Sequence, residues 1–250
     1  MLRALVLLLT RMFNALARAA SRRISPGYQL LIPYATYAPW LRDHAFSTVY
    51  ERVRRISLVN RFQCWELWQL VEDTAAIDGD VIEIGVYRGA SAAIMASKLR
   101  LLGSSSRLFC CDTFSGVVKP SDRDNHYRGG EHADTSLASV ERLFGDLGLS
   151  KVTILAGIFP DHTGASVADR TFRLCHVDVD VYESARAALE WIWPRTSVGG
   201  VVVFNDYGYP RTGGITRLVE EQRGRAGRFV IHNLNGSGIV VKTASVAHDD

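Results

Sequence analysis

The chain has 250 residues, 47% of them hydrophobic and 22% charged, with a formal net charge of +3 at pH 7. These proportions are typical of a globular protein and exclude wholesale disorder, and so small a charge does not indicate a nucleic-acid partner. The length allows one large α/β domain, with or without an appended helical segment.

The N-terminal segment has the pattern of an amphipathic helix. Leucine, methionine and phenylalanine recur with helical spacing at positions 2, 5, 8, 9, 12, 13 and 16. The run is too short to span a bilayer, and Arg11 interrupts its likeness to a signal peptide. We expect this helix to dock on the protein or to pair with a second copy in a homodimer, in preference to peripheral contact with a membrane. Arginines are frequent before Ser57, which favours an anionic surface or acidic partner as much as a solvated face.

Residues 1–76 are rich in aromatic side chains, are broken by prolines, and are expected to form an N-terminal helical extension. A turn signal at 78–80 introduces a different pattern, which occupies residues 77–250. Short runs that are apolar throughout alternate there with helix-length segments, so the sequence predicts a Rossmann-like, doubly wound, mostly parallel α/β sheet. The expected strands are 81–84, 107–111, 152–155, 174–177, 200–204, 229–231 and 238–241, and the expected helices are 91–101, 137–147, 185–193 and 214–222.

The four cysteines, Cys64, Cys110, Cys111 and Cys175, show no CxxC spacing. Three of them lie in apolar runs that are expected to be central strands, where free cysteine behaves as a small hydrophobe. We interpret them as reduced core residues of a cytoplasmic protein.

Acidic and amide side chains follow two of the expected strands. Asp178 and Asp180 come after the run at 174–177, and Asn205 and Asp206 come after the run at 200–204. One helix separates the two runs, so they form a βαβ unit whose parallel strands end at the same edge of the sheet. Open α/β sheets bind ligands at that edge. These oxygens would suit Mg²⁺ or another divalent cation, although acids that cap the next helix are the alternative.

A glycine-containing turn follows the first expected strand. Gly85 and Gly89 allow a sharp turn and a close approach to a ligand, and Glu83 at the strand end can hold an amine or a hydroxyl. Asp112 ends the second strand, where an acid accepts hydrogen bonds from ribose hydroxyls. The dinucleotide pattern GxGxxG is not present, which favours a nucleoside ligand without a pyrophosphate, such as S-adenosylmethionine (SAM). The alternative is a purely structural turn.

Five segments resemble, in order, the motifs of the macrocin and mycinamicin O-methyltransferase family, which methylates sugar hydroxyls with SAM and Mg²⁺. The resemblance extends from Phe62 to Glu221 and implies a class I SAM methyltransferase fold. The segments are DVIEIGVYRG at 80–89, CDTFSG at 111–116, GIFPDHT at 157–163, HVDVDVYES at 176–184, and SVGG with NDYG at 197–208.

The resemblance also implies site residues. It implies a divalent cation bound by Asp178, Asn205 and Asp206, with Asp178 also acting as the general base. The family has paired aspartates where this chain has Asn205 and Asp206, so the site carries one negative charge fewer. A polar loop with His126 and His132 is interpreted as solvated rather than as a cover for the substrate. The implied SAM contacts are Glu83, Gly85, Tyr87, Gly89, Ser91 and Asp112.

We therefore expect a SAM-dependent, divalent-metal-assisted O-methyltransferase that acts on a hydroxyl of a sugar or glycosylated metabolite. Two alternatives stay open. A catechol-type O-methyltransferase acting on a phenolic diol would use a flatter aromatic pocket, for which the N-terminal Tyr and Trp residues are available. A non-catalytic SAM-fold scaffold that binds a glycan or a biosynthetic partner is the other alternative.

Overall fold

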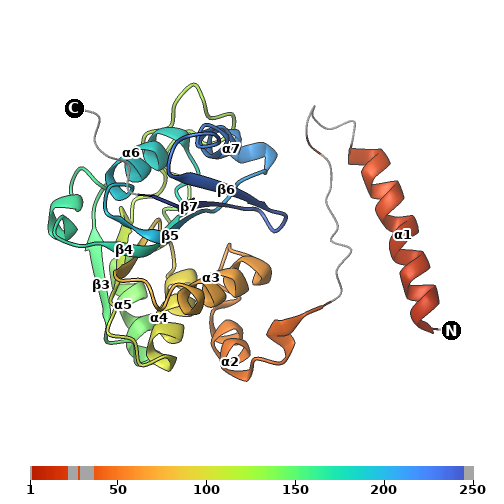
Figure 1. Cartoon of the computed structure of the whole chain (residues 1–250), viewed down its shortest axis with the longest axis horizontal. Helices are drawn as coiled ribbons and strands as arrows, with labels where there is room; N and C mark the ends of the chain where they lie inside the picture. Colours follow the sequence, from red (N-terminus) through yellow and green to blue (C-terminus); the bar gives the residue numbers. More distant parts are fainter. Residues whose placement is uncertain (1, 22–27, 29–36, 245–250) are drawn as a thin grey trace. The chain divides into compact units, whose positions relative to one another are not determined.

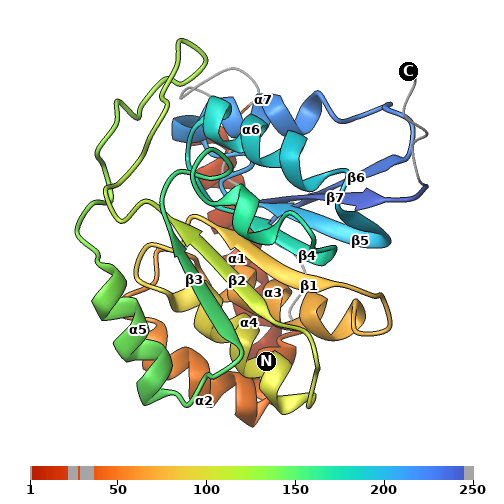
Figure 2. The same ribbon diagram turned by 90° about the vertical axis from the view of Figure 1, so that its left-hand side faces the viewer.

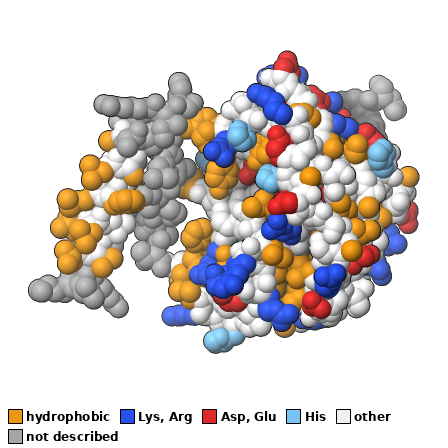
Figure 3. Space-filling model, turned by 180° about the vertical axis from the view of Figure 1, so that it is seen from behind, with side chains coloured by type: hydrophobic (Ala, Val, Ile, Leu, Met, Phe, Trp, Pro, Cys, Tyr) orange, Lys and Arg blue, Asp and Glu red, His pale blue; other side chains and the backbone are white. Residues whose placement is uncertain are grey.

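The computed structural model describes residues 2–21, 28 and 37–244 and divides into two units, 1–38 and 39–250 (Figure 1). The described residues of the first unit include one helix, α1 (Leu2–Ser21), as the apolar spacing predicts. Hydrophobic side chains gather along one side of this helix (Figure 3). Among them, Leu5, Leu9, Phe13 and Leu16 are each more than half exposed. No helix in the described part of the chain is long and apolar enough to cross a membrane.

The second unit is built on a seven-stranded sheet with the order β3-β2-β1-β4-β5-β7-β6. The first five strands in this order are parallel, and β7 pairs antiparallel with both β5 and β6. This confirms the predicted doubly wound, mostly parallel α/β fold. The strands are β1 (Asp80–Ile84), β2 (Leu108–Asp112), β3 (Val152–Ala156), β4 (Phe172–Val177), β5 (Thr196–Phe204), β6 (Arg228–Asn233) and β7 (Ser237–Lys242).

Helices cover both faces of the sheet (Figure 2). Strand side chains alternate between two hydrophobic clusters, because successive residues of a strand point to opposite faces. In β1, for example, Val81 belongs to the cluster beneath α2–α5, whereas Ile82 belongs to the cluster beneath α6 and α7. The helices are α2 (His44–Val53), α3 (Arg61–Asp73), α4 (Ala90–Leu101), α5 (Leu137–Asp146), α6 (Tyr182–Ile192) and α7 (Gly213–Glu220), with short 3-10 turns at Pro39–Leu41, Gly164–Val167 and Pro210–Thr212.

The compact unit that holds the sheet begins at Pro39, so α2 and α3 belong to it. Phe46 of α2 and Trp68 of α3 are almost fully buried in the cluster that also contains α4. The division into a helical extension at 1–76 and a methyltransferase domain at 77–250 stays a prediction. What the packing shows is that α2 and α3 help to form one face of the core.

All four cysteines are free and buried, as expected for core residues. The change in strand order lies between β1 and β4, because β2 and β3 continue on one side of β1 while β5, β7 and β6 continue beyond β4. The carboxyl ends of β1 and β4 therefore flank the crevice in which open α/β sheets bind ligands.

Candidate functional site

A cavity of about 320 Å³ opens at the carboxyl ends of the parallel strands. Its walls come from the segments that follow β1, β2, β3, β4 and β5, from the loop between β2 and α5, and from residues 56–59 ahead of α3. The size lies within the range of small-molecule sites. The acids at the ends of β2, β4 and β5, which the sequence placed at one edge of the sheet, do meet in this cavity.

Gly85 makes the turn that brings β1 against the end of β4. Its φ is +88°, and a Cβ atom there would lie 1.8 Å from the backbone oxygen of Asp178. No side chain fits at this position, so the turn after β1 and the end of β4 are in contact through their backbones. Gly89 then forms the N-cap of α4, also with a positive φ.

Asp112 fastens this turn to the end of β2. Its Oδ2 accepts hydrogen bonds from the backbone N–H groups of Val86 and Tyr87, at 2.7 and 2.8 Å, and its Oδ1 accepts one from Phe114 at 2.6 Å. A carboxylate offers about four lone-pair positions, so three bonds leave room for one ribose hydroxyl. The acid therefore holds the turn as well as lining the cavity.

Glu83 lies beneath the cavity rather than on its wall. It is fully buried, and its Oε1 accepts a hydrogen bond of 2.8 Å from Nδ1 of His176 on β4. Burial lowers the pKa of His176, but the hydrogen bond and the charge of Glu83 outweigh it and leave the pKa raised. The pair joins β1 and β4 directly below the crevice.

The residues assigned to SAM are thus divided by position. Gly85, Tyr87, Ser91 and Asp112 line the cavity, whereas Glu83 and Gly89 do not. The cavity suits SAM in size, in its glycine turn and in its acid at the end of β2. Direct contacts between these residues and SAM stay a prediction.

Three further carboxylates, those of Asp178, Asp180 and Asp206, line the cavity. Asp178 follows β4, while Asp180 and Asp206 both have φ of +65°, a backbone conformation that few residues other than glycine adopt. Burial raises the pKa of Asp178 to about 6, and burial with the charges of Asp178 and Asp180 raises the pKa of Asp206 to about 9. Asp206 is therefore harder to ionise than Asp178.

Asn205 presents its amide nitrogen to this cluster. Nδ2 of Asn205 donates to Oδ1 of Asp178 at 2.9 Å, and its Oδ1 accepts from Nε2 of Gln63 on α3. Within the described residues, no group of three or more His, Cys, Asp or Glu side chains is arranged to hold a metal ion. Because Mg²⁺ and Ca²⁺ take oxygen ligands, Asn205 is not placed as a ligand in this arrangement, in which its nitrogen faces Asp178. Metal binding by Asp178, Asn205 and Asp206 stays a prediction.

The polar part of the loop between β2 and α5, residues 122–134, reaches the cavity through two residues, Tyr127 and His132, whereas His126 is exposed, as the solvated interpretation expects. Nε2 of His132 lies 3.4 Å from the Tyr127 hydroxyl and 4.0 Å from the Asp180 carboxylate. Sequence reasoning missed Tyr127 and Gln63. Helical spacing marks Gln63 only as part of α3, and nothing local shows that either residue reaches a strand end far away in the sequence.

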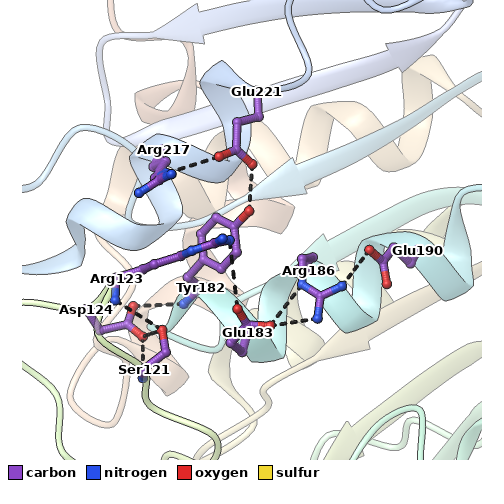
Figure 4. A network of polar contacts seen from close by, with 9 residues as sticks. All are labelled: Ser121, Arg123, Asp124, Tyr182, Glu183, Arg186, Glu190, Arg217 and Glu221. Atoms are coloured by element: carbon purple, nitrogen blue, oxygen red, sulfur yellow. Dashed lines mark hydrogen bonds and ion pairs between the residues drawn. The ribbon is translucent and has the colours of Figure 1, made fainter.

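Asp124 anchors this loop to the beginning of α6 (Figure 4). Its Oδ1 accepts from the backbone N–H of Tyr182 at 2.8 Å, and its Oδ2 accepts from the backbone and the hydroxyl of Ser121 at 2.9 Å. Arg123 stacks 4.3 Å above the Tyr182 ring, and the Tyr182 hydroxyl donates to Glu221 at 2.6 Å. The loop between β2 and α5 is thus fixed to α6 and, through Tyr182, to the end of α7.

The family comparison agrees with the motifs. A model of the macrocin-O-methyltransferase (TylF) family matches residues 57–227. The chain is 31% identical over 174 residues to 8-demethyl-8-(2,3-dimethoxy-alpha-L-rhamnosyl)-tetracenomycin-C 4'-O-methyltransferase of Streptomyces olivaceus, with 65% of each protein covered. It is also 31% identical over 163 residues to mycinamicin III 3''-O-methyltransferase of Micromonospora griseorubida, covering 60% of this chain and 63% of that one. The chain thus spans less than two thirds of the length of these relatives.

Solved structures show the same fold. The O-methyltransferase NovP is 25% identical and superposes with a TM-score of 0.62 over 73% of this chain and 80% of NovP. The calicheamicin methyltransferase CalS11 is 18% identical, with a TM-score of 0.62 over 87% of this chain and 98% of CalS11. The fold is therefore that of class I SAM methyltransferases.

Proposed function

Because the chain belongs to the macrocin-O-methyltransferase family, we propose that it transfers a methyl group from SAM to a hydroxyl of a sugar or glycosylated metabolite. The observation that carries the proposal is one cavity whose lining has two unlike parts. The Gly85 turn and Asp112 form a part of the lining suited to a nucleoside, and Asp178 lines the same cavity beside that turn. Relatives named for methylating tetracenomycin and mycinamicin glycosides support the choice of acceptor.

Asp178 is the base in this proposal. The pKa of its carboxylate, raised by burial to about 6, makes it a stronger proton acceptor than an exposed aspartate while leaving it ionised at pH 7. The amide N–H of Asn205 holds one of its oxygens at 2.9 Å. When bound, SAM supplies the electrophilic methyl group. Asp178 takes the proton of the acceptor hydroxyl, and Tyr127 and His132 keep the loop over the reacting groups.

The divalent cation that the sequence indicated has no part in this proposed step. Asn205 offers an N–H where a ligand oxygen would be needed. The metal requirement is therefore a separate question, which a chelator and a cation titration can answer.

Isothermal titration of the protein with SAM, followed by incubation with SAM and a panel of acceptors, tests the function. The panel contains deoxysugar glycosides of polyketides, simple sugars and a phenolic diol, with mass spectrometry to detect the gain of one methyl group. We expect SAM to bind and a glycoside to be methylated. Methylation of the diol alone would favour a catechol-type enzyme, and SAM binding with no methylated product would favour a non-catalytic scaffold. Absence of SAM binding would contradict the proposal.

We also infer that the apolar side of α1 is covered when the protein works. Its exposed leucines and Phe13 form a continuous stripe, and the helix contains arginines but no acidic residue. An anionic membrane surface or a second copy of the chain would each cover such a stripe.

A further inference from the structure

A continuous chain of side-chain amides runs from the N-terminus of α3 to Asp178. Asn60, the N-cap of α3, contacts Gln63, Gln63 contacts Asn205, and Asn205 contacts Asp178. Gln63 and Asn205 are only 4% and 8% exposed, so water cannot readily replace these hydrogen bonds. Buried polar groups keep such partners because leaving one unpaired is costly.

The direction of every amide in this chain is fixed at the α3 end. Oδ1 of Asn60 accepts from the backbone N–H groups of Phe62 and Gln63, at 2.9 and 3.0 Å. Oε1 of Gln63 accepts from the backbone N–H of Asn60 at 3.2 Å and from its Nδ2 at 2.6 Å. A backbone N–H can only donate, so the oxygens of both side chains must face these groups.

The same logic carries to Asn205. With its oxygen held by Asn60, Gln63 can present only Nε2 to Asn205, and Asn205 must then accept through Oδ1. Its Nδ2 is left facing Asp178. Amide orientations are normally a matter of assignment, but here backbone donors decide the whole chain.

We propose that Asn205 is a positioning residue for Asp178 and not a metal ligand. The amide chain from Asn60 turns Nδ2 of Asn205 toward Asp178, and this N–H orients and stabilises the carboxylate in place of a divalent cation. An N–H donor stabilises and orients an ionised carboxylate. An aspartate at position 205 would instead place two carboxylates against each other, a repulsion that a cation would relieve. Residue 205 and its partner Gln63 thus decide whether the site needs a metal.

Two isosteric substitutions test this. Asn205→Asp replaces the N–H donor by an oxygen. Gln63→Glu keeps the acceptor for Asn60 but places a second oxygen against Asn205, so the amide must turn and present Oδ1 to Asp178. Gln222→Glu is the matched control, because Gln222 is a glutamine that is 2% exposed, with its own backbone partner, and does not line the cavity.

Binding of Mn²⁺ alone to the full chain, followed by electron paramagnetic resonance, is the first readout. We expect the wild type and Gln222→Glu to bind Mn²⁺ weakly, and Asn205→Asp and Gln63→Glu to bind it at least about tenfold more tightly, since each adds an anionic or amide oxygen. Wild-type binding as tight as that of Asn205→Asp would overturn the proposal. So would the failure of both variants to gain binding.

Methyl transfer gives the second readout and rests on the proposed function. With a chelator present, we expect wild-type kcat to change by less than about twofold and kcat of Asn205→Asp to fall by about tenfold or more, with KM for SAM nearly unchanged. Mn²⁺ should restore the variant. Loss of wild-type turnover in chelator would contradict the role of Asn205, whereas a chain that transfers no methyl group under any condition would contradict the function and leave the Mn²⁺ result to decide this proposal.

Discussion

Asp178 takes part in both halves of the cavity. Its backbone oxygen lies under Gly85 so closely that no Cβ fits, and its carboxylate accepts from Asn205. A change to its side chain should therefore affect proton transfer, while the backbone contact that shapes the cofactor turn stays in place.

The first prediction is that Asp178→Asn removes the general base and leaves the affinity for SAM nearly unchanged. We expect kcat to fall by about 10²- to 10⁴-fold, the usual loss when a general base is removed. The dissociation constant for SAM, from isothermal titration, should change by less than about threefold. Near-normal turnover of the variant would show that another group accepts the proton.

The second prediction concerns pH. Burial raises the pKa of Asp178 from 3.8 to about 6, and a carboxyl group acts as a base only when ionised. Activity should therefore be lost as pH falls through about 6, rather than near 4. A series of kcat values at saturating substrate between about pH 3 and pH 8, with folding checked by circular dichroism, measures this limb. A limb near pH 4 would mean that the group which titrates is an exposed acid.

The positions of single residues in the cavity were predictable from the sequence where they depend only on which strand the residue follows. Asp112, Asp178 and Asp206 follow parallel strands, so they had to share one edge of the sheet. The orientation of Asn205 was not predictable, because it depends on Gln63, which is 142 residues away. Glu83 was expected on the cavity wall. It lies beneath the cavity instead, because a buried carboxylate needs a hydrogen-bond partner and His176 supplies one.

At the scale of elements, the turn after β1 gives the third prediction. Gly85→Ala should destabilise the protein by about 3 kcal/mol or more, because a Cβ would collide with backbone at a positive φ. It should also abolish SAM binding. Gly145→Ala in α5 is the control, since no atom lies within 4 Å of its Cβ, and should stabilise the chain by up to about 1 kcal/mol. Thermal denaturation compares the two, and equal melting temperatures would refute the collision.

The loop between β2 and α5 gives the fourth prediction. Asp124→Ala leaves the backbone N–H groups of Ser121 and Tyr182 without their acceptor, at a cost of about 1–3 kcal/mol. We expect faster hydrogen exchange over residues 117–131 and a higher KM for the acceptor, with KM for SAM nearly unchanged. Glu190→Ala removes an exposed partner of Arg186 and should change neither. Unaltered exchange in Asp124→Ala would mean that other contacts hold the loop.

The strands and helices of the sheet were largely predictable, with differences of a few residues at their ends. Observed β4 begins at Phe172 rather than at 174, and α6 begins at Tyr182 rather than at 185. Fully apolar runs separated by helix-length segments leave little choice other than a parallel sheet. The N-terminal part was less predictable, since the aromatic pattern of 39–76 does not show that α2 and α3 pack on the sheet.

At the scale of the whole molecule, α1 gives the fifth prediction. If an anionic membrane surface covers its apolar stripe, the full chain binds vesicles that contain phosphatidylserine and not vesicles of phosphatidylcholine alone, since the helix is basic. Phe13→Glu on the apolar stripe should weaken this binding by more than about tenfold. Thr10→Glu adds the same charge on the polar side and should cost about fivefold or less. Absence of vesicle binding, together with a dimer that Phe13→Glu dissociates, would assign the stripe to a second copy.

The order in which the cavity is assembled has a consequence for changing what the protein modifies. The part of the lining suited to a nucleoside is tied to the sheet through the Gly85 turn, so alterations there endanger the fold itself. Two other parts of the lining, residues 56–59 and the loop that holds Tyr127 and His132, belong to no strand. Libraries restricted to these two segments should therefore retain donor use while the range of acceptors diverges, which makes them the natural place to engineer a new methylation pattern.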